Sequence, residues 1–359
     1  MSGRQKIVAS AAVFVIVAAL SPQVAGAWFV NLANVAIAHS AALPQDSPQR
    51  LTDLNSAEDA LTLASFFSDG ERGLLAHARL LLARGDPAGA AETFDQRSPR
   101  LQSDPIARLL WAEAAQESNQ PVIAISHWRA AGAYVYYSQQ MHRAMDRHAW
   151  QTAEEYARVA VAIEPNISDA HLALGDALAH QKLDSTEALS ELDRARELTH
   201  DPELLSTIIS RKGEILAAQG KAQQALDQFD QARRYAPLDA RPRTGYALTL
   251  LKLQPDARDQ AIALLTQVVK DSPWYTDAYV ALANIFETGG DAKGAESWLN
   301  QGLVRNANNP ELLFALGQFY ARQHRVEEAK AALVQALSAE TRADNLQSIA
   351  ATLAGLTKP

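Results

Sequence analysis

The chain has 359 residues, 33 of them lysine or arginine and 41 aspartate or glutamate, with a formal net charge of −8. Nucleic-acid binding depends on clustered basic side chains, so this acidic balance argues against a nucleic-acid partner. There is no cysteine, which excludes disulfides, thiol catalysis and cysteine-ligated zinc. Alanine and leucine dominate, and runs of β-branched residues are scarce after the N-terminus. This composition predicts an all-α fold.

The first thirty residues have the features of a membrane-targeting segment. Arg4 and Lys6 precede residues 7–20 (IVASAAVFVIVAAL), which carry no charge, and an A-x-A pattern ends at Ala27. A secretory signal peptide typically has a basic start, a short apolar stretch and small residues before its cleavage site. In this interpretation the mature protein begins at Trp28.

The same segment also supports an uncleaved N-terminal hydrophobic helix as a membrane anchor. Read through to Val30, the apolar run reaches the roughly 20 residues that cross a bilayer, although residues 21–23 interrupt it. A third alternative is a buried helix of a cytoplasmic protein. The first two alternatives leave the two basic residues inside the cell. The rest of the chain is therefore expected at the outer face of the cytoplasmic membrane, either tethered by a single-pass anchor or exported.

A stripe of small and bulky residues recurs along the chain. In residues 220–237, Ala225, Phe229 and Ala232 are spaced so that they share one helix face, and Pro237 follows as a helix breaker. Equivalent stripes recur 29 to 37 residues apart and begin at Ala90, Ala124, Ala153, Ala188, Ala261, Ala295 and Ala329. A period of this size indicates a helical repeat array.

Each repeat also has a preceding helix with a stripe of its own, such as Leu313, Leu316-Gly317 and Tyr320. The residues expected to start and end helices agree with this. In Gly85-Asp86-Pro87 the glycine ends one helix, the aspartate caps the next helix and the proline lies in its first turn. Each repeat is therefore predicted to be a pair of helices.

These patterns resemble the tetratricopeptide repeat family, whose motif has an aromatic residue, Leu-Gly and Tyr on helix A and Ala, Phe, Ala and Pro on helix B. The resemblance is closest in residues 206–237 and 310–341. It implies an α-solenoid, a right-handed superhelix of helix hairpins stabilised by stacking between neighbours. His148 and Lys182 depart from the motif, because the family usually has glycine there.

The resemblance also gives a domain organisation. Residues 1–27 are the signal peptide or anchor, and residues 28–70 form a degenerate repeat or N-terminal cap whose first helix is expected at 28–43. Eight repeats follow over residues 71–341. Residues 342–359 are a capping helix and tail that shield the last repeat from solvent.

No motif indicates catalysis. His142 and Asp146 are four residues apart and share a helix face, which could suit a metal or an acid–base pair, but a solvated ion-pairing surface explains them better. No G-x-S-x-G context provides a nucleophile, and Gly220-Lys221 lacks the spacing of a phosphate loop. The chain is expected to be no enzyme and to hold no cofactor or metal.

In tetratricopeptide repeat proteins helix A lines the inner, concave face, and the repeat register predicts which residues lie there. The candidates for partner binding are Glu113, Gln116, Glu117, His142, Met145, Asp146, Asp176, His180, Glu214, Asn284, Glu287 and Gln318. This lining is acidic, so it is expected to favour neutral or basic peptide segments and to repel acidic ones. Of the family's carboxylate-clamp residues only Asn284 has a counterpart, so that clamp is not expected.

The sequence thus predicts a non-enzymatic scaffold for protein–protein interactions, membrane-anchored or exported, that binds a partner protein or peptide on its concave helix A face. An alternative is a helical accessory subunit that positions an envelope enzyme such as a glycosyltransferase or polymerase.

Overall fold

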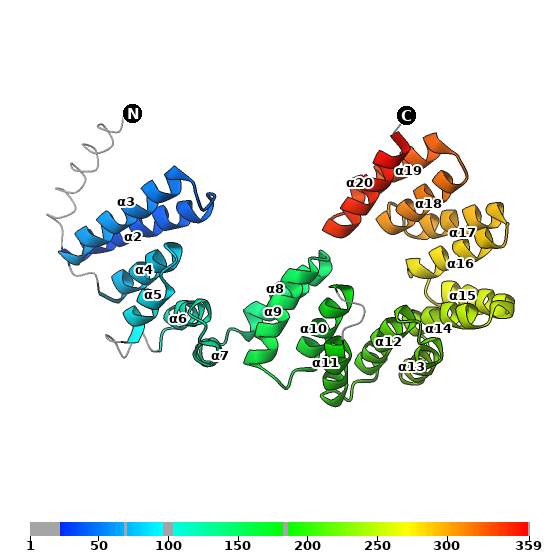
Figure 1. The fold of residues 1–359 in the computed structure, drawn as a ribbon, viewed down its shortest axis with the longest axis horizontal. Helices are drawn as coiled ribbons and strands as arrows, with labels where there is room; N and C mark the ends of the chain where they lie inside the picture. Colours follow the sequence, from blue (N-terminus) through cyan, green and yellow to red (C-terminus); the bar gives the residue numbers. More distant parts are fainter. Residues whose placement is uncertain (1–21, 68–69, 96–102, 182–185, 358–359) are drawn as a thin grey trace. The chain divides into compact units, whose positions relative to one another are not determined.

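The computed structural model of the protein describes residues 22–67, 70–95, 103–181 and 186–357. Within these ranges the regular elements are nineteen α-helices and one 3₁₀ turn, without a strand (Figure 1). This confirms the prediction of an all-α solenoid. The chain divides into two compact units, unit 1 (residues 1–135) and unit 2 (residues 136–359). The division falls in the first turn of helix α8 (Tyr134–Asp146). The apolar run at 7–20 lies outside the described residues.

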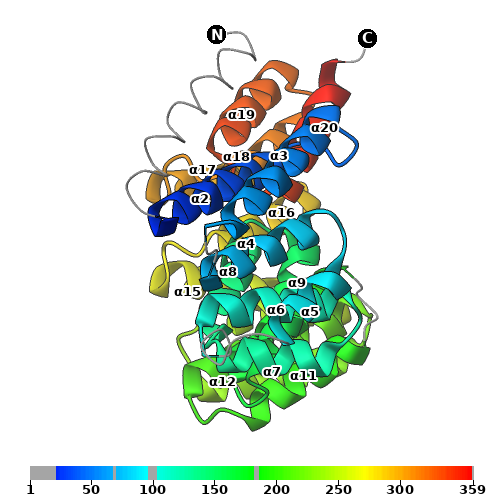
Figure 2. The same ribbon diagram turned by 90° about the vertical axis from the view of Figure 1, so that its left-hand side faces the viewer.

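Unit 1 contains three helix pairs. They are α2 (Pro22–Ala41) with α3 (Pro48–Ser65), α4 (Gly70–Ala83) with α5 (Pro87–Asp95), and α6 (Pro105–Glu117) with α7 (Pro121–Ala130). In each pair the two helices pack against each other, and Figure 2 shows α2 and α3 side by side. Phe29, Ile37, Leu54 and Leu61 are buried between the first pair. Within the described residues α2 includes residues 22–27 as well as most of the helix expected at 28–43.

Unit 2 continues with further helix pairs and a last single helix. They are α8 (Tyr134–Asp146) and α9 (Trp150–Ile163), α10 (Ser168–Gln181) and α11 (Thr186–Glu197), α12 (Pro202–Ala218) and α13 (Ala222–Tyr235), α14 (Ala240–Leu253), the 3₁₀ turn Pro255–Ala257 and α15 (Arg258–Asp271), α16 (Thr276–Thr288) and α17 (Ala292–Arg305), α18 (Pro310–Arg322) and α19 (Val326–Ala339), and α20 (Ala343–Thr357). From α9 onward each helix packs on its successor, and α20 also packs on α18. The last helix therefore covers the end of the array, as a capping helix does.

The alanine that begins each stripe is fully buried. All eight have no exposed surface: Ala90, Ala124, Ala153, Ala188, Ala225, Ala261, Ala295 and Ala329. The distance between two helix axes depends on the side chains between them, so a methyl group at this position lets helix B approach helix A closely. This burial confirms that the stripe is the packing face of helix B.

Phe229 on α13 shows how the bulky member of the stripe is accommodated. A Cβ atom added to Gly213 on α12 would lie 2.8 Å from its ring, and one added to Gly245 on α14 would lie 2.5 Å from it. The ring therefore fills a space that exists only because both facing helices have glycine at the contact. One aromatic side chain on helix B thus joins its own repeat to the next.

Turns and caps fix where the helices end. Gly220 has a φ of +77°, a left-handed conformation in which glycine avoids the Cβ penalty. His148 occupies the corresponding place after α8 and also has a positive φ of 53°. Asp201 caps α12 by accepting hydrogen bonds from the backbone N–H groups of Glu203 and Leu204. Lys182, the other departure from the family pattern, lies outside the described residues.

Candidate functional site

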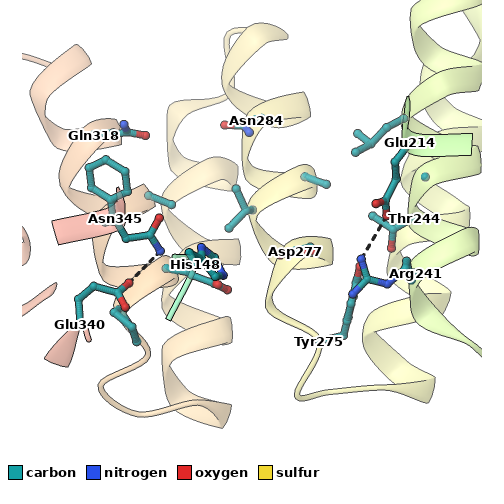
Figure 3. A pocket seen from close by; sticks show the side chains of 18 of the residues that line it. His148, Glu214, Arg241, Thr244, Tyr275, Asp277, Asn284, Gln318, Glu340 and Asn345 are labelled. Atoms are coloured by element: carbon teal, nitrogen blue, oxygen red, sulfur yellow. Dashed lines mark hydrogen bonds and ion pairs between the residues drawn. The ribbon is translucent and has the colours of Figure 1, made fainter. Parts of the chain in front are cut away.

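The inner side of unit 2 holds a cavity of about 550 Å³ (Figure 3). Its walls come from α12, α14, α16 and α18, which are the first helices of four consecutive pairs. Two further elements reach it: His148 in the turn after α8, and Asn345 and Ile349 on α20. His148 Nδ1 lies 3.1 Å from Asp344 Oδ2 on α20, so the row of helices curves far enough for its two ends to meet.

The repeat register arranges the cavity in three rows. A charged row contains Arg241, Asp277 and Glu311, which begin α14, α16 and α18. One turn further along the same helices is a row of small residues, and two turns along is an edge row. The small row is Gly245, Ala281 and Ala315, and the edge row is Leu248, Asn284 and Gln318. Equivalent members lie 36 and then 34 residues apart, so the helical repeat itself generates the rows.

Glu214 is held at one end of the cavity by two guanidinium groups. Arg211 Nη1 lies 2.9 Å and Arg241 Nη1 3.2 Å from its carboxylate oxygens. Arg211 also pairs through Nε, at 3.0 Å, with Asp176, which is buried. Burial raises the pKa of Asp176, and Arg211 opposes this effect. These ion pairs join α10, α12 and α14 across the inner face.

At the other end of the cavity, Glu311 and Glu340 share one cation, the guanidinium group of Arg342. Arg342 Nη1 lies 2.6 Å from Glu311, and its Nη2 lies 2.8 Å from Glu340. Glu340 also accepts hydrogen bonds from Asn345 Nδ2, at 2.9 Å, and from the backbone N–H groups of Thr341 and Arg342. This network attaches the start of α20 to α18.

Asp277 differs from the other carboxylates of the cavity. Glu214 and Glu311 have arginine partners within 3.2 Å, whereas Asp277 has no cation at ion-pair distance among the described residues. Burial and the nearby carboxylate of Glu311 raise the pKa of Asp277. Its neighbour Tyr275 also has a raised pKa, chiefly because of burial and then because of the charge of Asp277. Asp277 shares a side-chain hydrogen bond with Tyr275 and feels the charge of Arg241, but no cation lies at ion-pair distance from it among the described residues.

The structure brings three of the twelve predicted partner-binding residues together in this cavity: Glu214, Asn284 and Gln318. Asn284 and Gln318 are equivalent residues of α16 and α18, and Figure 3 shows both at the same edge of the cavity. The other nine predicted residues lie elsewhere.

Three of those nine contact ionisable side chains within the protein. Asp176 is buried against Arg211, as described above. Glu287 binds Arg322 through two hydrogen bonds of 3.0 and 2.7 Å and also accepts one from Gln323. His142 Nε2 lies 3.2 Å from Asp169 Oδ2 on α10, so the carboxylate that it contacts there belongs to the next repeat rather than to its own helix.

Two more of the nine lie near the end of α8, and one lies on α10. Met145 is half-buried beside Ala144, Ala153 and Ala177, and Asp146 is exposed. His180 is exposed and stacks on Trp150 with ring centroids 3.8 Å apart. These aromatic and packing contacts are ordinary links between adjacent repeats.

The remaining three predicted residues, Glu113, Gln116 and Glu117, are exposed on α6 of unit 1. Partial desolvation and the neighbouring charge of Glu117 raise the pKa of Glu113. Since these residues belong to the other compact unit, they form a separate surface from the cavity.

Sequence reasoning missed the charged row. Arg241, Asp277 and Glu311 were not among the candidates, although each lies seven residues before Leu248, Asn284 or Gln318. Residues seven apart face the same side of a helix. The choice of Asn284 and Gln318 therefore already indicated Asp277 and Glu311, which lie two turns earlier on the same helices. No such signal exists for His148 and Asn345, which reach the cavity through tertiary packing.

The described residues contain no group of three or more His, Asp or Glu side chains arranged to hold a metal ion. One described helix, α2, is long and apolar enough to cross a membrane, and 39% of its apolar window is buried in the structure.

Two stretches of the chain match sequence models of a known family. A model described as tetratricopeptide repeat matches residues 253–312, and a second with the same description matches residues 310–341. The chain therefore contains tetratricopeptide repeats. The two matches cover α15 to α19, which include α16 and α18 of the cavity wall.

The chain is also similar to several solved structures. A thermophilic TPR protein of Thermus thermophilus, TTC0263, is 22% identical over 52% of this chain and 99% of its own, with a TM-score of 0.44. Pseudomonas aeruginosa pilF is 16% identical over 61% and 97%, with a TM-score of 0.41. The human IFIT1 dimer with PPP-AAAA is 14% identical over 86% and 77%, with a TM-score of 0.47. No curated protein matches the sequence significantly.

Proposed function

We propose that the protein is a non-enzymatic scaffold that holds a segment of a partner protein on the inner, helix A side of unit 2. The observation that carries this proposal is the cavity lined by the first helices of four consecutive repeats. Its small middle row, Gly245, Ala281 and Ala315, gives an approaching chain access to the helix surfaces. Such a mixture of an apolar floor and a few polar edge groups is typical of a binding site.

The cavity also brings together groups that a partner could recognise. Gln335 on α19, by contrast, is exposed and does not line the cavity. The cavity instead collects Phe314 and Val280 beside hydrogen-bonding groups from several helices. Apolar and polar groups that converge from separate repeats provide specificity that single surface residues do not.

Site-specific photo-cross-linking in the native host tests the proposal. We expect a photoreactive amino acid at Gln318, in the cavity, to capture a discrete partner, whereas the same group at Gln335, outside the cavity, should not. A second change, Ala315→Arg, fills the small row and should abolish the cross-link from Gln318. Thermal unfolding followed by circular dichroism checks that this variant stays folded.

Equal capture from both positions, or capture that survives Ala315→Arg in a folded protein, would show that the cavity is not the binding face. The identity of the partner separates the scaffold from the accessory-subunit alternative, since an envelope glycosyltransferase or polymerase would favour the latter.

We further propose that the protein stays attached to the membrane through residues 7–20 and is not cut before Trp28. Ala25 and Gly26 are buried in α2, and a cut after Ala27 would remove the first part of this helix. Phe29 and Ile37 are part of the core with α3, which favours α2 as a structural helix and the preceding apolar run as the anchor.

Membrane fractionation tests the anchor. We expect the full chain to remain in the membrane pellet after washing with sodium carbonate, and mass spectrometry to detect peptides that span Ala27 and Trp28. Deletion of residues 7–20 should move the protein into the soluble fraction, since the apolar run would then be absent. A mature N-terminus at Trp28 would instead establish the signal-peptide alternative.

A further inference from the structure

We propose that the cavity takes an extended peptide segment carrying a lysine or arginine, and that the cationic head group of this residue pairs with Asp277. The inference rests on the proposed function, because it assumes that the inner face of unit 2 binds a partner. It adds the chemical class of the partner, the conformation of the bound segment and the residue that selects it.

The charges that line the cavity favour a cation. Four carboxylates, Glu214, Asp277, Glu311 and Glu340, face one guanidinium, Arg241. Two arginines reach these carboxylates from outside this lining: Arg342 neutralises Glu311 and Glu340 in part, and Arg211 pairs with Glu214. Glu311 and Glu340 thus share an arginine at one end of the cavity, and Glu214 has arginine partners at the other. Asp277 lies between them with a hydrogen bond to Tyr275 but with no cation at ion-pair distance among the described residues. An incoming ammonium or guanidinium group would complete the row, whereas an acidic segment would be repelled.

Thr244 supplies a second polar group at the cavity wall. Thr244 lines the cavity next to Gly245 and is only 4% exposed, yet its hydroxyl oxygen has no hydrogen-bond partner among the described residues. Buried polar groups are nearly always paired in native structures. The Thr244 hydroxyl is therefore available to a polar atom of a bound segment.

The edge row favours an extended backbone. Asn284 and Gln318 have side-chain amides with a donor and an acceptor each, and neither has a partner in the described structure. A peptide group offers the complementary acceptor and donor. Because the two amides occupy equivalent positions on α16 and α18, they can contact one strand of backbone at two points, while Asp277 lies two helical turns away on the opposite edge.

The helix spacing gives the length of the bound segment. Packed helices lie about 8–10 Å apart, and an extended chain advances about 3.3 Å per residue. One repeat therefore corresponds to about three residues of peptide. The four helices that line the cavity span three such intervals, so a segment of about nine residues would cross it.

The experiment uses the full-length protein and two sets of synthetic nine-residue peptides with blocked ends. One set has a single lysine at its centre in varied alanine, valine and serine backgrounds, and the other has norleucine in its place. Fluorescence polarisation measures Kd for the wild type, for Asp277→Asn and for the control Asp259→Asn. Asp259 also lies in the first turn of a helix, α15, but outside the cavity, so both variants lose one charge and one helix-dipole interaction.

We expect the wild type and Asp259→Asn to bind the lysine peptides about tenfold more tightly than the norleucine peptides, as for a charge-assisted hydrogen bond. Asp277→Asn should lose this preference and bind both sets alike. If the wild type binds both sets equally, or if Asp277→Asn retains the preference, the inference is wrong although the binding face stands. If no peptide of either set binds at millimolar concentration, the proposed binding face itself fails.

Discussion

Phe229→Ala is expected to lower the free energy of unfolding by about 3–5 kcal/mol, the range found for large-to-small changes of buried aromatic residues. Phe229 is 1% exposed and fills the space between Gly213 on α12 and Gly245 on α14. Its loss would open a cavity between two repeats at once. Urea unfolding followed by circular dichroism measures the effect. As a control, Tyr235→Ala on the same helix removes an aromatic ring that is 38% exposed and should cost far less.

A double-mutant cycle makes this prediction more specific. In an ordinary helix Gly→Ala stabilises by about 1 kcal/mol, because alanine has the higher helix propensity. Gly245→Ala should instead destabilise the wild type, since the new methyl group would lie 2.5 Å from the ring of Phe229. In the Phe229→Ala background the same change should be neutral or stabilising. Additive effects of the two changes would mean that the ring does not occupy the glycine contact.

Glu340→Gln is expected to lower the free energy of unfolding by about 2–3 kcal/mol at neutral pH. Burial alone would raise the pKa of Glu340, but hydrogen bonds from Arg342, Asn345 and the backbone outweigh it and hold the pKa at about 2. A carboxyl with a lowered pKa in the folded state stabilises the protein above its unfolded pKa, near 4.5. This contribution is lost as the pH falls from there towards 2.

The pH dependence distinguishes this effect from a simple loss of packing. The difference in unfolding free energy between the wild type and Glu340→Gln should be constant above about pH 5 and should narrow as the pH falls below 4.5. Glu327→Gln on α19 is the control, because this side chain is 87% exposed and its pair with Lys330 is worth little. A difference that does not change with pH would indicate that the charge of Glu340 does not stabilise α20.

The repeat period allowed much of the fold to be predicted. Spacings of four and three residues place Ala225, Phe229 and Ala232 on one helix face, and the structure buries all three. Such local geometry follows from the α-helix itself and needs no tertiary information. The pattern did not predict that residues 22–27 are already part of α2, because Pro22 was interpreted as a break between segments.

The site was predicted less well than the fold. The register correctly selected the edge residues Asn284 and Gln318, but it also selected Asp176 and Glu287, whose charges are paired inside the protein. Register specifies the face on which a residue lies. It does not specify whether an arginine from the next repeat, such as Arg211 or Arg322, will reach it.

The sequence by itself determined the helix pairs, their period and the burial of the alanine stripe, because these depend on contacts between residues a few positions apart or one repeat apart. Only the tertiary structure decided where the cavity lies and which of its carboxylates has no cation at ion-pair distance among the described residues. The reason is that the curvature of unit 2 sums small rotations over many repeats, until His148 meets Asp344 across 196 positions of the chain.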